Sequence, residues 1–281
     1  MAEAERDPQI FAKANFLFDY PYPDQFTRSE WDRNKRPSRL YMVYRVLAMI
    51  YFLAWFAADL IVDEIGRNRE QYYLQYVTNW TFCLFNLHLI LSVLLVLPIC
   101  NSQTRSGRTT ILLEFHWFIY NLVLAATVFV CLVFWPLVFD PSGGPPTIYS
   151  IHLHGVNGIF LIIDLFLVAI PLRLLHVWVP MSYTALYAVF SVIFYLSGAR
   201  SKEGERYVYK ALNFGAHPLQ AFLTILGFIF VGIPLVHAAM YGLFRLRAFV
   251  SDRCCRRGDV VAPLYEPQNE NVNEISSYGT L

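Results

Sequence analysis

The residues most able to do chemistry lie in an otherwise apolar stretch, HLHGVNGIFLIID at positions 152–164. In a regular helix, the spacing of His154, Asn157 and Asp164 places all three side chains on one face. Polar groups at membrane depth are costly, and an ionisable one there marks a functional-site hypothesis by default. This face is therefore the first candidate site.

A threonine at the start of another apolar stretch could complete such a site. A threonine hydroxyl becomes a nucleophile when a nearby base, such as histidine, takes its proton. Thr78 and His154 each lie near the start of an apolar stretch, and they share a leaflet if the two stretches run in the same direction. In the structural alternative, Thr78 caps a helix N-terminus and His154 satisfies a neighbouring backbone group.

A second set of polar residues is predicted deeper in the same bundle. It comprises Asn86, His88, His116, Asn121, Asp164 and His237. Histidine and aspartate bind zinc or relay protons, but no short metal motif such as HExxH is present, so we expect no metal and no cofactor. A tie between helices, with Asp164 paired to a histidine, is the simpler alternative.

The elements that must position these residues are membrane-spanning helices. The chain is 56% hydrophobic and only 15% charged, whereas soluble domains are about 25% charged. Six apolar segments reach the length of about 20 residues that crosses a bilayer, at 40–62, 76–99, 111–138, 149–171, 175–198 and 218–244. We predict an all-α, six-helix transmembrane bundle, and the net charge of +1 gives no reason to expect a nucleic-acid partner.

The distribution of basic residues predicts that both termini are cytosolic. That arrangement places 15 Lys and Arg residues on the cytosolic side and six on the other. We predict a cytosolic segment at 1–39, a transmembrane domain at 40–247 and a cytosolic tail without fixed structure at 248–281. The aromatic residues Phe16, Phe18, Tyr20 and Tyr22 are expected to pack on the cytosolic face of the bundle.

Cys254 and Cys255 follow the last predicted span and are flanked by arginines. A cysteine pair in this position suggests S-palmitoylation and attraction to anionic lipid, with unmodified tail thiols as the alternative. A transporter is a further alternative for the bundle, although no paired set of broken helices or internal repeat supports it.

Several short motifs, taken together, resemble the rolling stone proteins of animals. The motifs are FTRSEW at 26–31, YVTNWTF at 76–82, HGVN at 154–157 with Asp164 beyond it, and YVYKALNFGAHP at 207–218. The resemblance covers nearly the whole chain except the tail. It places the chain in a wider superfamily that includes the androgen-induced membrane proteins.

This resemblance implies two functions of different class. Rolling stone proteins are associated with myoblast fusion, which implies a plasma-membrane protein that acts in cell–cell fusion with protein partners at its cytosolic termini. The androgen-induced relatives are threonine hydrolases of fatty acid esters of hydroxy fatty acids, and their threonine matches Thr78. Their catalytic histidine is the second of an HGxH-like pattern, where this chain has Asn157. Asparagine is not a general base at neutral pH, so hydrolysis would require His154 or His152 instead.

Overall fold

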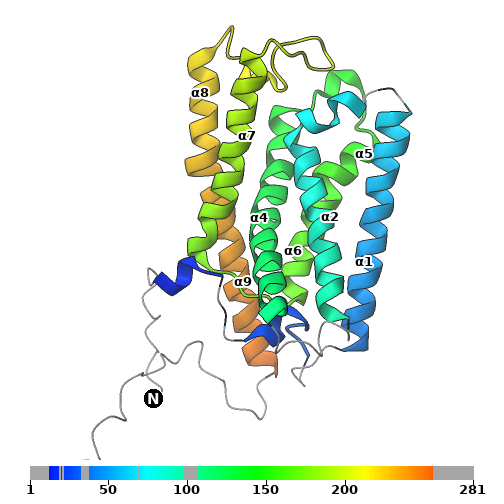
Figure 1. Cartoon of the computed structure of the whole chain (residues 1–281), viewed down its shortest axis with the longest axis vertical. Coiled ribbons are helices and arrows are strands. Elements are labelled where there is room, and N and C mark those ends of the chain that lie inside the picture. The colour runs from blue at the N-terminus through cyan, green and yellow to red at the C-terminus, as the bar shows by residue number, and fades with distance from the viewer. Residues whose placement is uncertain are drawn as a thin grey trace, which may run out of the picture.

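Six membrane-spanning helical segments form one bundle in the computed structural model, which describes residues 13–18, 20, 22–32, 38–66, 68, 70–97 and 107–255. The long helices are α1 (Arg39–Ala58), α2 (Val77–Val96), α4 (Gly107–Leu137), α6 (Asn157–Leu167), α7 (Trp178–Leu196), α8 (Pro218–Gly227) and α9 (Ile233–Cys255). Short helical segments extend several of them, and α8 continues into α9 along one side of the bundle (Figure 1). The described residues form no β-strand beyond one isolated bridge. The predicted all-α, six-span fold is confirmed.

The core of the bundle is the pair α2 and α4. About two thirds of each of these two spans is buried within the protein, compared with less than two fifths of any other span. Helix α4 contacts α2, α6, α7 and α9, and α1 covers the other side of α2. Helices suit this environment because hydrocarbon offers no hydrogen-bond partner to exposed backbone groups. Polar side chains on α2 and α4 therefore face protein rather than lipid.

The two ends of the bundle carry different loops, and they are called the outer end and the inner end. The outer end carries residues 138–147 and 197–217, and the inner end carries the N-terminal residues 13–32 and the connection 168–173. In Figure 1 these ends are the top and the bottom of the bundle. The assignment of the inner end to the cytosol remains a prediction from the Lys and Arg distribution.

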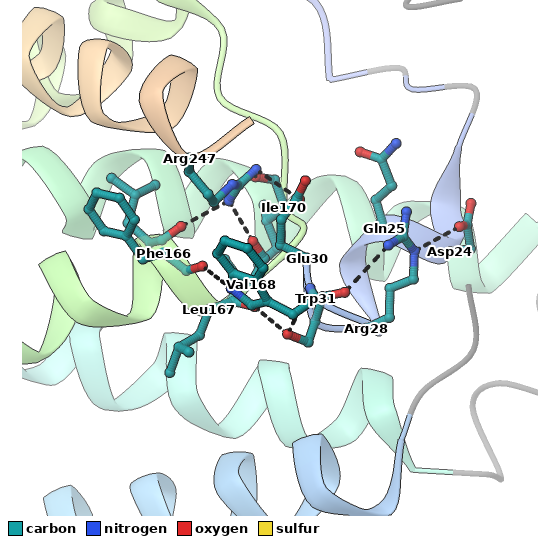
Figure 2. A network of polar contacts seen from close by, with 12 residues as sticks. Asp24, Gln25, Arg28, Glu30, Trp31, Phe166, Leu167, Val168, Ile170 and Arg247 are labelled. Atoms are coloured by element: carbon teal, nitrogen blue, oxygen red, sulfur yellow. Dashed lines mark hydrogen bonds and ion pairs between the residues drawn. The ribbon is translucent and has the colours of Figure 1, made fainter. Parts of the chain in front are cut away.

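The N-terminal segment is held against the inner end by hydrogen bonds to the end of α6. The Ser29 hydroxyl and the Glu30 amide both donate to the Leu167 carbonyl oxygen, at 2.7 and 3.0 Å. The Trp31 indole donates to the Phe166 carbonyl oxygen. Figure 2 shows this segment lying across the end of the helix.

Arg247 of α9 completes this junction. Its fully buried guanidinium donates to the carbonyl oxygens of Leu165, Val168 and Ile170 and pairs with Glu30 at 3.4 Å (Figure 2). Since the last carbonyl groups of a helix have no partner within it, this side chain supplies donors where α6 ends.

The prediction that the aromatic residues of the N-terminal segment pack on the bundle is confirmed for Phe18 and Tyr20, and Tyr22 packs on Tyr20. The prediction is wrong for Phe16. The Phe18 ring lies 5.5 Å from the ring of Trp117 and 4.2 Å from that of His176, and Tyr20 contacts both Tyr22 and Trp117. The Phe16 side chain is 45% exposed because it points away from this cluster.

The ends of two spans differ from the predicted boundaries. The fourth span was predicted to reach residue 171, but α6 ends at Leu167 and the chain continues as an extended connection. The last helix runs to Cys255 rather than ending at 244, because Arg247 and Ser251 of its polar end are buried against the inner end of the bundle. The tail without fixed structure was predicted at 248–281, but its residues up to Cys255 belong to this helix, and residues 256–281 lie outside the described part of the chain.

Candidate functional site

A cavity of about 630 Å³ lies between the helices in the outer half of the bundle. Cavities that bind small molecules have volumes of about 300–1,000 Å³. Apolar side chains of α4 and of the α8–α9 segment line its depth, including Phe129, Val133 and Phe228, while Lys202 and Glu205 of the outer loop lie at one side. Its buried polar lining consists of Asp59, Thr78, Asn79, His154, Tyr183 and Tyr187 together with Ser201 and Tyr209 of the outer loop. The cavity is thus lined mainly by apolar side chains, with a few polar groups among them.

Thr78 lies in the first turn of α2 and lines this cavity. The residue at the N-cap of α2 is Tyr76, and no side chain caps this helix. The capping role considered for Thr78 is therefore not the one that the structure gives it. Its hydroxyl is placed in the cavity, beside Tyr209.

His154, in the segment His152–Val156, lines the same cavity. Its ring stacks on Phe134 with a centroid separation of 3.4 Å and an interplanar angle of 1°. The Nδ1 atom has no hydrogen-bond partner among the described residues, so the ring does not serve a backbone group as the structural alternative proposed. The backbone carbonyl oxygen of His154 instead accepts from the Trp135 indole. Stacking on Phe134 holds the imidazole ring, and its Nδ1 atom is left without a hydrogen-bond partner among the described residues.

The two neighbours of His154 that sequence reasoning considered lie outside the cavity lining. His152 stacks on Trp55 and its Nε2 atom lies 2.9 Å from the Tyr51 hydroxyl oxygen. The Asn157 carboxamide oxygen accepts from the Gly158 amide at 2.9 Å and from the Cys131 thiol at 3.4 Å. His154 is thus the histidine of this stretch that shares the cavity with Thr78.

Asp59 is a polar residue of the cavity that sequence reasoning missed. It is 4% exposed and begins η3 (Asp59–Ile65), the π-helical segment that continues α1. The signal was present in the sequence, since Asp59 interrupts the apolar run AWFAADLIV. Its position near the end of the first span made it resemble an interfacial residue.

Three π-helical segments each contribute at least one residue to the cavity lining. These segments are η3, η6 (His152–Val156) and η9 (Phe228–Gly232), which contribute Asp59, His154 and Phe228. π-Helical turns are rare and occur frequently at functional sites. Their concentration around one cavity supports its assignment as the candidate site.

Tyr209, in the outer loop, provides a protonated hydroxyl beside Thr78. Burial raises the pKa of Tyr209 to about 12, although the neighbouring Thr78 and Tyr187 side chains oppose the shift. The phenol therefore remains neutral at physiological pH and can donate a hydrogen bond to a developing negative charge.

In the inner half of the bundle, Asp164 joins α6 to α1. Its carboxylate accepts from the Tyr44 hydroxyl at 2.7 Å and from the Arg45 guanidinium at 2.9 Å. The side chains of Arg45 and Asp164 are 1% and 0% exposed. The partner of Asp164 is thus an arginine that sequence reasoning did not single out, and not the histidine that was expected.

The remaining inner polar residues each have a different hydrogen-bond partner. The His237 Nε2 atom lies 3.1 Å from the Arg173 carbonyl oxygen, and the His116 Nε2 atom lies 3.0 Å from the Ser92 hydroxyl. Asn86 and Asn121 each donate to a carbonyl oxygen of their own helix. The described residues contain no group of three or more His, Cys, Asp or Glu side chains arranged to hold a metal ion.

Cys254 is an exposed free thiol in the last turn of α9. The Cys255 side chain lies outside the described side chains, and palmitoylation of the pair stays a prediction.

The six spans and the cavity define a multi-pass helical membrane protein with a ligand-sized site in its outer half. A family model described as Protein rolling stone matches residues 8–257. The protein rolling stone of Drosophila melanogaster is 28% identical over 249 residues, which cover 84% of this chain and 87% of that protein. The chain belongs to the rolling stone family, which confirms the resemblance seen in its motifs. No solved structure matches it.

Proposed function

We propose that the outer cavity binds an ester of a long-chain fatty acid and that Thr78 hydrolyses it with His154 as the base. The observation that carries this proposal is that both side chains line one ligand-sized, mainly apolar cavity. The apolar depth suits an acyl chain, whereas the polar groups near Thr78 suit an ester.

The proposed reaction has two steps. The Thr78 hydroxyl oxygen bonds to the ester carbonyl carbon while His154 takes the hydroxyl proton. The ester C–O bond then breaks, and the departing alkoxide takes that proton from His154. Water next attacks the acyl-threonine with His154 as base, which releases the fatty acid and returns the proton to Thr78. The neutral Tyr209 phenol is placed to stabilise the carbonyl oxyanion.

A fluorophosphonate probe tests this proposal, because an activated hydroxyl oxygen displaces its fluoride and forms a stable phosphonate ester. We expect the purified full chain to be labelled at Thr78 and the Thr78→Ala variant to lose the label. Ser191→Ala is the matched control, since the buried Ser191 hydroxyl donates to the Tyr187 carbonyl oxygen and lies outside the cavity lining. Labelling that persists in Thr78→Ala would exclude Thr78 as the nucleophile.

We further propose that the protein acts in cell–cell fusion of the myoblast type, or a related membrane process, at the plasma membrane. Family membership supports this role. The short outer connections at 138–147 and 197–217 favour action through membrane lipid and through protein partners at the termini, rather than through a large outer domain.

Cell mixing tests the fusion proposal. Cells that carry two halves of a reporter are expected to mix their contents less when this chain is depleted, and to recover when it is supplied again. Rescue by Thr78→Ala would separate fusion from ester hydrolysis. Unchanged mixing after depletion would count against the fusion role.

A further inference from the structure

A group of buried polar side chains in the inner half of the bundle has unused hydrogen-bonding atoms. The group comprises Arg45, Asn86, His88, His116, Tyr120, Asn121 and Asp164, each at most 4% exposed. Each has at least one nitrogen or oxygen without a partner among the described residues, and His88 has both ring nitrogens in this state. We propose that this group binds a cluster of ordered water molecules and is an internal hydrated site.

The three ring-bearing members His88, His116 and Tyr120 are adjacent. The His88 ring stacks on His116 at a centroid separation of 5.0 Å and lies 5.2 Å from the ring of Tyr120. The His88–Tyr120 and Ser92–His116 contacts also fix the register of the antiparallel helices α2 and α4. This register places Asn86 and Asn121 at the next level toward the outer end.

The ion pair between Arg45 of α1 and Asp164 of α6 supplies the remaining charged members of the group. Arg45 and Asp164 share one hydrogen bond, which leaves one guanidinium nitrogen and one carboxylate oxygen without a partner. Buried charged groups are stable only when their remaining hydrogen-bonding atoms are satisfied. The pair therefore requires a further partner of small size.

The mixture of donors and acceptors identifies that partner as water. Arg45 offers a donor, whereas Asn86, Asn121 and Asp164 offer oxygen acceptors. A cation does not suit the guanidinium, and an anion does not suit the carboxylate and amide oxygens. Water both donates and accepts, and a buried water molecule typically makes about three hydrogen bonds to such groups.

The hydrated site is separate from the outer cavity, since none of its seven residues lines that cavity. Thr127 lies between them on α4, where its buried hydroxyl also has no partner among the described residues, and Ala126 beside it lines the cavity. Polar atoms without a partner among the described residues thus follow α4 from His116 through Tyr120 to Thr127, toward the candidate site.

X-ray radiolytic footprinting with mass spectrometry tests the proposal on the full chain in nanodiscs. Ionised water makes hydroxyl radicals where it is bound, so His88, His116 and Tyr120 should be modified several-fold faster than Trp117. Trp117 is the matched control because it is 0% exposed and its indole donates to the Pro171 carbonyl oxygen. Modification of all three residues no faster than Trp117 would overturn the proposal.

An Asn121→Leu variant gives an independent test, because the proposal predicts whether its melting temperature falls or rises. If the Asn121 oxygen binds water, its removal breaks a hydrogen-bonded network, and the melting temperature should fall by several degrees. If the oxygen is dry, its removal relieves an unsatisfied buried acceptor, and the melting temperature should rise. A rise would therefore overturn the proposal, and Asn86→Leu repeats the test on α2.

Discussion

An Arg45→Met variant is expected to unfold far more readily than the wild-type chain. Methionine fills a similar space but leaves the Asp164 carboxylate buried and without its cation. Breaking a buried ion pair from one side costs about 3–5 kcal/mol. With about 2–4 °C per kcal/mol for a chain of this size class, the melting temperature in detergent should fall by about 6–20 °C.

The double variant Arg45→Met with Asp164→Leu distinguishes the charge from the packing. Since an apolar pair can replace a buried ion pair at little cost, most of the lost stability should return. A double variant as unstable as Arg45→Met alone would show that shape, and not the uncompensated carboxylate, controls this junction.

The second large effect is expected on ester hydrolysis. His154→Phe keeps an aromatic ring of similar shape to stack on Phe134 but removes both ring nitrogens. Loss of a general base lowers the rate by about 10²–10⁴-fold. Hydrolysis of a fluorogenic fatty-acid ester by the purified chain measures the effect, and the melting temperature should stay close to that of wild type.

Asn157→His is the companion variant, because the resemblance to the androgen-induced proteins implies a catalytic histidine at this position. Here the Asn157 side chain binds Gly158 and Cys131 and does not line the cavity. We therefore expect no gain in hydrolysis from Asn157→His. A clear gain would mean that position 157 reaches the substrate, and the assignment of His154 as the base would fail.

The spans were predictable because their length and apolar content are set by the bilayer. The partner of Asp164 was not predictable. A single arginine five residues inside a span, such as Arg45, can also extend its side chain back to the membrane surface. Pairing of Arg45 with Asp164 depends on which helices are neighbours, and sequence patterns did not supply that information.

The candidate site was predicted only in part, for a reason of helix geometry. His154 and Asn157 were expected on one face because a regular helix was assumed. The π-helical segment η6 contains His154 and ends just before Asn157, and its wider turn changes the angle between the two side chains. Neither the wider turn nor the cavity is visible in residue spacing.

The contacts of Arg247 have a consequence for the order of assembly during synthesis. The carbonyl oxygens that it binds at the end of α6 emerge from the ribosome about 80 residues before it does. Until the last span is made, these groups lack the donor that the finished protein gives them, and Glu30 lacks its cation. The junction of the fourth and last spans with the N-terminal segment is therefore completed last, so a ribosome that stalls before residue 247 releases a chain with an unfinished inner end.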